Sequence, residues 1–232
     1  MSANPRWLTP PRERALRHGL TIAGLAFTIE FIWIALSGQW FGDAHSFWFN
    51  SPTTMYLDFH VGYGTGYGYA PAFAQVLTPL RLLPWPVFSV LWSAMLVFVL
   101  WWLLRGTPRR WAIPLALISL PEVIVGNVHL LLAAAIVVGF TYPASWAFVL
   151  LTKITPGVGL LWFAIRREWR RLATALIATA AVAAISLILD PHLWPAWLAA
   201  LWANRDAQGA GIQILPGLIV RLPIAAIVVA WG

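Results

Sequence analysis

The sequence predicts an all-α bundle of membrane-spanning helices, and two observations of composition support this fold class. Of the 232 residues, 60% are hydrophobic and only 10% are charged, and the mean hydropathy is +0.76. A soluble globular domain carries about 25% charged residues, so this chain has too few polar side chains to cover a water-exposed surface. The 16 tryptophans indicate many membrane–water boundaries. We therefore expect a polytopic membrane protein.

The spans are expected in order along the chain. A helix of about 20 apolar residues crosses a bilayer core about 30 Å thick. Stretches of this kind run over residues 19–38, 84–104, 172–189 and 214–231. The apolar stretch 111–165 crosses an even number of times, either as two long helices or as four short pieces. We favour four broken pieces, because the stretch contains several helix breakers: Pro121, Gly126, Tyr142-Pro143 and Pro156-Gly157.

Arginine clusters predict the topology. Eleven of the 15 basic residues fall in the leader (residues 1–18), in residues 105–110 and in residues 166–171. Such clusters beside apolar runs are typical of cytoplasmic loops rather than of a nucleic-acid interface, so no nucleic-acid partner is expected. The chain is then a single integral domain, residues 1–232, in the cell membrane with a cytoplasmic N-terminus. Two outer loops follow, 39–83 with a juxtamembrane helix and 190–213.

The first outer loop contains two Asp-x-His pairs, Asp43/His45 and Asp58/His60. Asp43 follows the first span between aromatic clusters, where a carboxylate at a half-apolar surface can act as a general base. The alternative for Asp43 is an exposed loop aspartate or the N-cap of a helix over 44–49. The two pairs also leave a divalent metal ion open as a cofactor, although no metal ligand is assigned.

Four charged residues lie inside apolar stretches, where ionisable groups are costly and frequently functional: Glu30, Glu122, Lys153 and Arg221. Lys153 lies at a break between two pieces, where its ammonium can hold a phosphate or, alternatively, snorkel to the interface. The two glutamates are expected to form buried ion pairs with arginines. Asn127 and His129 follow a glycine; the structural interpretation is an N-cap followed by a histidine inside the bundle.

These residues, in this order, resemble the integral membrane glycosyltransferases of family 87, which have the GT-C architecture and use polyprenyl-phosphate-linked sugars. The resemblance covers about residues 20–222. The motifs that carry it are Asp43, Tyr69-Ala70-Pro71, Pro79-Leu80-Arg81-Leu82-Leu83-Pro84, Gly126-Asn127-Val128-His129, Lys153-Ile154-Thr155-Pro156 with the arginines of 166–171, and Gln213, Pro216-Gly217 and Arg221.

The resemblance implies an inverting hexosyltransferase-type enzyme with Asp43 as its catalytic base. Its partners would be a polyprenyl-phosphate-linked sugar, such as mannose or another hexose or pentose, a lipid or glycan acceptor, and membrane lipids. Lys153 and Arg221 would stabilise the leaving phosphate. The remaining substrate-binding candidates are His45, Asp58, His60, Tyr67, Tyr69, Asn127, His129 and Gln213.

Two other classes of function compete with this interpretation. Broken segments and buried charges are also typical of a transporter or lipid flippase, although no second copy of the Lys153 break is present to form a repeat. A non-catalytic, truncated relative of the transferases is the third class.

The topology is tested by cysteine labelling, because the chain contains no cysteine of its own. We expect a membrane-impermeant maleimide to label His45→Cys in intact cells, and to label Thr107→Cys and Glu168→Cys only after permeabilisation. Labelling of position 107 from outside would overturn the predicted orientation.

Overall fold

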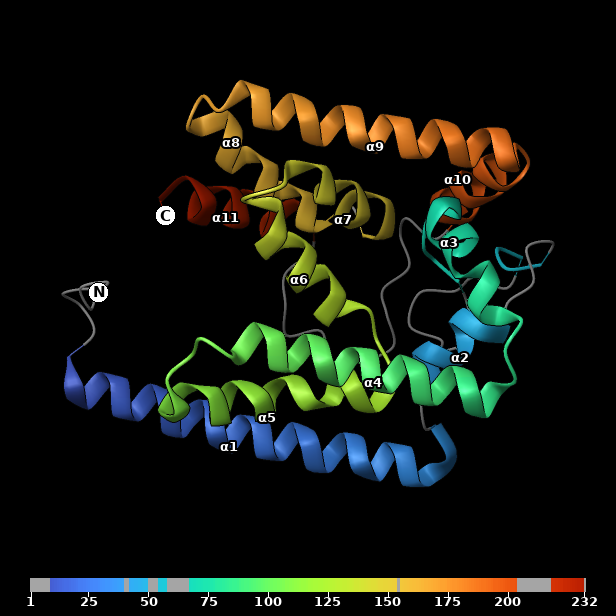
Figure 1. Ribbon diagram of the computed structural model, residues 1–232. Helices are drawn as coiled ribbons and strands as arrows, with labels where there is room; N and C mark the ends of the chain where they lie inside the picture. Colours follow the sequence, from blue (N-terminus) through green and yellow to red (C-terminus); the bar gives the residue numbers. More distant parts are fainter. Residues whose placement is uncertain are drawn as a thin grey trace. The chain divides into compact units, whose positions relative to one another are not determined.

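The computed structural model describes residues 9–39, 42–49, 54–57, 67–153, 155–203 and 218–231 (Figure 1). All regular structure in these residues is helical, which confirms the predicted all-α class. By their internal contacts, residues 1–45 and 86–131 form one compact unit, and residues 46–85 and 132–232 form a second.

Eleven α-helices are described. They are α1 (Pro10–Ile34), α2 (Gly42–Phe49), α3 (Pro71–Arg81), α4 (Trp85–Leu104), α5 (Arg109–Val125), α6 (His129–Gly139), α7 (Trp146–Thr152), α8 (Leu161–Ile165), α9 (Trp169–Leu189), α10 (Leu193–Ala203) and α11 (Leu218–Trp231). Short 3₁₀ turns precede α7 (Pro143–Ser145) and α8 (Thr155–Leu160).

Three of the described helices are long and apolar enough to cross a membrane: Pro10–Gly38, Trp85–Leu104 and Trp169–Leu189. They coincide with three of the predicted spans. Two of them begin earlier than predicted, because the helix continues through arginines that we assigned to loops. The α1 helix starts at Pro10, because proline suits the first helical turn. The negative charge of Glu13 in that turn interacts favourably with the helix dipole.

The apolar stretch 111–165 falls into four helical pieces, α5 to α8, as the breakers predicted. The breaks lie at Gly126–Val128, at Phe140–Tyr142 and at Lys153. Pro121 was wrongly expected to break the helix: it lies inside α5 together with Pro114. Neighbouring segments can satisfy the carbonyls that such prolines free within membrane helices. Whether each piece crosses the bilayer stays a prediction.

In the first unit, α1 packs along α5 (Figure 1). Gly24 is buried at the closest approach, where an added Cβ atom would lie 2.8 Å from the backbone nitrogen of Ile118. One turn further, Thr28 donates a hydrogen bond to the Leu117 carbonyl at 3.0 Å. Small residues of this kind allow two membrane helices to approach closely.

The expectation that Glu30 is buried is wrong. Glu30 lies on an exposed face of α1, and the described residues provide no ion-pair partner for it. A different glutamate forms an ion pair between α1 and α5. Glu13 lies 3.4 Å from the guanidinium of Arg110, near the start of both helices.

In the second unit, α9 packs against α7 and α3. The Gln75 side chain of α3 donates a hydrogen bond to the Ser186 carbonyl of α9 at 3.0 Å, and Trp194 donates to the Ser186 hydroxyl at 3.1 Å. Polar groups on facing helices thus satisfy each other, which matters because lipid offers them no partner.

The close approach at Gly24 gives a matched pair of glycine variants in one helix. Gly24→Ala should destabilise the protein by about 1–3 kcal/mol, because the new methyl group forces α1 and α5 apart. Gly19→Ala should be neutral or stabilising by up to about 1 kcal/mol, because nothing lies within 4 Å of its added Cβ atom. Tryptophan fluorescence during unfolding in mixed micelles measures both; equal effects would contradict the packing.

Candidate active site

A left-handed turn at Gly126 ends α5 and leads into α6. Gly126 has φ 73° and ψ 31°, a conformation that glycine adopts without strain. The Asn127 N–H closes the turn on the Glu122 carbonyl at 2.9 Å. The indole of Trp92, which is buried in α4, donates a hydrogen bond to the Gly126 carbonyl at 2.7 Å. Hydrogen bonds to α5 and to α4 therefore stabilise the turn.

Asn127, the next residue, links this turn to Asp43. Its side-chain amide nitrogen donates a hydrogen bond to Oδ2 of Asp43, 84 residues earlier in the chain. Its amide oxygen accepts the N–H of His129 at 3.2 Å, at the start of α6. Asn127 lies one residue before the N-cap position rather than at it, but it still satisfies the first N–H of α6 and also orients a carboxylate.

Asp43 lies in the first turn of α2, where the helix dipole favours a negative charge. It is half-buried, while His45, two residues later, is exposed. The carboxylate is therefore oriented by Asn127 without being enclosed.

Glu122 pairs with His129 rather than with an arginine, which corrects our expectation. Nδ1 of His129 lies 2.8 Å from Oε2 of Glu122, and the side chains are 41% and 33% exposed. The histidine is therefore not enclosed in the bundle. A carboxylate on Nδ1 orients the imidazole ring and directs Nε2 to the opposite side.

The second unit holds an aromatic cluster made by Phe47, Tyr56, Tyr67, Tyr69 and Phe73. The ring centroids of Tyr67 and Tyr69 lie 5.4 Å apart, and those of Phe47 and Tyr69 lie 5.2 Å apart. The Tyr56 hydroxyl donates a hydrogen bond to the Tyr69 carbonyl at 2.9 Å. Tyr67 and Tyr69, two predicted sugar contacts, are therefore neighbours.

The hydroxyl of Tyr67 is buried and has no hydrogen-bond partner among the described residues. Burial raises the pKa of this phenol well above its usual value, and the neighbouring Arg81 only partly opposes the shift. Burial also lowers the pKa of Arg81, whose Nε donates to the Trp48 carbonyl at 3.3 Å. The sequence placed Arg81 in a family motif, but nothing in its pattern indicated that it faces this phenol.

Lys153 ends α7 in an extended conformation (φ −140°, ψ 118°), at the break where the sequence placed it. The side chain is half-buried. The adjacent residue, Thr152, lines an apolar cavity of about 200 Å³ between α3, α7 and α9. Its other lining residues are Ala72, Phe73, Val76, Ala147, Phe148, Leu151 and Val182.

Several predicted site residues lie outside the described part of the chain. They are Asp58, His60 and Gln213, and the side chain of Arg221 in α11 is likewise not described. Among the residues that are described, no three His, Asp or Glu side chains are grouped so as to hold a metal ion. The metal hypothesis involved Asp58 and His60, so it stays untested.

The fold and the half-buried polar turn define a class, that of helical membrane proteins with a polar site built on broken helices. Residues 67–232, more than half of the chain, match the family model of glycosyltransferase family 87. The chain therefore belongs to glycosyltransferase family 87, which confirms the resemblance and makes it a membrane glycosyltransferase. Asp43 and His45 precede the matched residues. No curated protein and no solved structure gave a significant match.

The tyrosine cluster provides a second matched pair of variants. Tyr56→Phe should cost about 1 kcal/mol, because it leaves the Tyr69 carbonyl without its donor. Tyr67→Phe should cost nothing or stabilise slightly, because it removes a buried hydroxyl that lacks a described partner. Unfolding free energies in mixed micelles measure the difference. A loss at Tyr67 equal to that at Tyr56 would show that the Tyr67 hydroxyl has a partner.

Proposed function

We propose that this protein transfers a sugar, mannose or another hexose or pentose, from a polyprenyl-phosphate donor to a lipid or glycan acceptor on the outer membrane face. Membership of glycosyltransferase family 87 supports sugar transfer in general. The observation that carries the finer proposal is the hydrogen bond from Asn127 to Asp43, because it orients a half-buried carboxylate. The protein would be a multi-pass cell-membrane enzyme with a cytoplasmic N-terminus.

The proposed reaction is a single displacement with Asp43 as general base. Its carboxylate takes the proton of the acceptor hydroxyl while that oxygen attacks the anomeric carbon opposite the donor phosphate. The bond from the anomeric carbon to the phosphate oxygen breaks, and polyprenyl phosphate leaves with the electron pair. Attack from the opposite side inverts the anomeric configuration. A general base positioned in this way contributes about 10²–10⁴-fold to the rate.

The pairing of His129 with Glu122 supports a role for His129 in substrate binding. Because the carboxylate engages Nδ1 at 2.8 Å, it fixes the plane of the imidazole ring. A ring held in this way presents Nε2 to a sugar hydroxyl in one orientation. His129 follows Asn127 by two residues, so the same turn would orient both the base and a substrate contact.

The donor phosphate is assigned to Lys153, with Arg221 as a second cation. A fixed positive charge stabilises the charge that develops on a departing phosphate. Lys153 adjoins the apolar cavity at Thr152, which suits part of the lipid chain of the donor. The further sugar or acceptor contacts proposed are His45, Asp58, His60, Tyr67, Tyr69 and Gln213.

Transfer assays with purified protein test the assignment. With a decaprenyl-phosphate-linked mannose donor and a panel of glycolipid acceptors, we expect Asp43→Asn to reduce kcat by about 10²–10⁴-fold. Asn127→Ala should reduce kcat by up to about 10²-fold through misplacement of the base. Lys153→Ala should reduce turnover because the leaving phosphate loses its cation.

Asp190→Asn is the matched control, because Asp190 also lies near a helix end and accepts a backbone N–H, that of His192, at 3.1 Å. Its turnover should equal that of the wild type. Full turnover by Asp43→Asn would exclude Asp43 as the base. A wild-type protein that transfers no sugar but moves lipid or solute across vesicles would instead be a transporter.

A further inference from the structure

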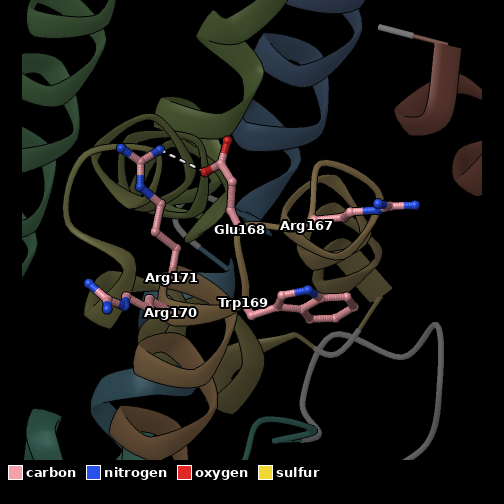
Figure 2. Close-up of a pocket in the computed structure, with 5 residues that line it drawn as sticks. All are labelled: Arg167, Glu168, Trp169, Arg170 and Arg171. Atoms are coloured by element: carbon pink, nitrogen blue, oxygen red, sulfur yellow. Dashed lines mark hydrogen bonds and ion pairs between the residues drawn. The ribbon is translucent and has the colours of Figure 1, made fainter.

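The turn between α8 and α9 places four arginines within six residues: Arg166, Arg167, Arg170 and Arg171. Residues 167–171 line a surface hollow of about 640 Å³ (Figure 2). The proposed transfer reaction uses none of these side chains. The hollow therefore calls for a separate explanation.

The backbone of this turn holds an arginine where glycine is favoured. Arg167 has φ 58°, the left-handed region. Its N–H bonds to the Ala164 carbonyl at 3.1 Å, and the Glu168 N–H bonds to the Phe163 carbonyl at 2.8 Å. These two bonds form a Schellman motif, in which glycine usually occupies the left-handed position. Arginine at this position is a disadvantage to the fold, and it adds a positive charge to the hollow.

The charges at the start of α9 are also unfavourable for the helix alone. Arg170 and Arg171 lie in its first turn, where the helix dipole disfavours cations. Arg171 pairs with Glu168 at 2.8 Å, and Arg166 stacks on the Trp162 ring at 3.7 Å. Arg167 and Arg170 are exposed, and no ion-pair partner for either lies among the described residues. An external anion would complement either charge.

The position of the turn indicates which anion. α9 begins at Trp169 and is long and apolar enough to span the membrane, so its first residues lie at the level of the lipid headgroups. The Trp169 side chain is 59% exposed and lines the same hollow, as tryptophans at membrane interfaces commonly do. In Figure 2 the side chains of Arg167 and Trp169 extend to one side of the turn and those of Arg170 and Arg171 to the other.

We infer that this turn binds the headgroup of an anionic phospholipid, with Arg167 contacting phosphate oxygens, Trp169 on the same side lying against the upper acyl chains, and Arg170 adding positive charge from the other side of the turn. The preference of basic residues for cytoplasmic loops would explain the number of arginines. It does not explain an arginine in a left-handed conformation or the hollow that these side chains surround. Basic pockets at the membrane surface bind anionic headgroups through the same chemistry.

Lipid titration of the purified protein tests this site. Native mass spectrometry in detergent should show tighter binding of dioleoyl phosphatidylglycerol than of dioleoyl phosphatidylcholine. The double variant Arg167→Gly/Arg170→Gln should weaken phosphatidylglycerol binding by about five-fold for each arginine removed and leave phosphatidylcholine binding unchanged. Arg105→Gln/Arg109→Gln removes the same charge from another arginine cluster and should leave the preference intact.

Stability separates this role from a structural one. Arg167→Gly should keep or raise the unfolding temperature, because glycine suits the left-handed position; if the double variant does not fold, Arg170→Gln alone is used. Equal affinity for the two lipids would overturn the site. An equal loss in the charge-matched control would attribute the preference to bulk charge. Displacement of the lipid by inorganic phosphate, but not by chloride at matched ionic strength, would assign the hollow to a free anion instead.

Discussion

The left-handed turn at Gly126 is the constraint on which the polar site depends. Only a residue that adopts positive φ readily can end α5 so that the next backbone N–H returns to the Glu122 carbonyl. The turn presents the Asn127 amide to Asp43 and starts α6 so that His129 lies beside Glu122. A side chain at position 126 would strain this geometry and disturb both pairs together.

Hydrogen bonds between facing helices explain how an apolar chain keeps polar side chains at all. Thr28 and Gln75 each donate to a carbonyl of another helix, and the Trp92 indole donates to the carbonyl of Gly126. In lipid each such group would otherwise be unsatisfied at a cost of several kcal/mol. The buried Tyr67 hydroxyl is different, because the described residues leave it without a partner.

Much of the fold could be predicted from the sequence, because its signals are local. Apolar length predicted the three long helices, and Gly126, Tyr142-Pro143 and Pro156-Gly157 predicted three breaks. Pro121 misled us because tertiary packing tolerates proline inside a membrane helix. The pairing of Asp43 with Asn127 could not be predicted, since no local pattern records a contact across 84 residues. The pairing of Glu122 with His129 depends on the turn that separates them, so the expectation that Glu122 pairs with an arginine gave the wrong partner.

The hydrogen bond from Asn127 to Asp43 also has a consequence for the order in which the protein is made. Asp43 emerges from the ribosome well before Asn127, and until α5 and its turn have been synthesised the carboxylate has no amide to orient it. A nascent chain that contains only α1 and α2 therefore carries the proposed base in an unassembled form. Catalytic competence would arise during biosynthesis only after α5 and the turn that follows it have packed against α1.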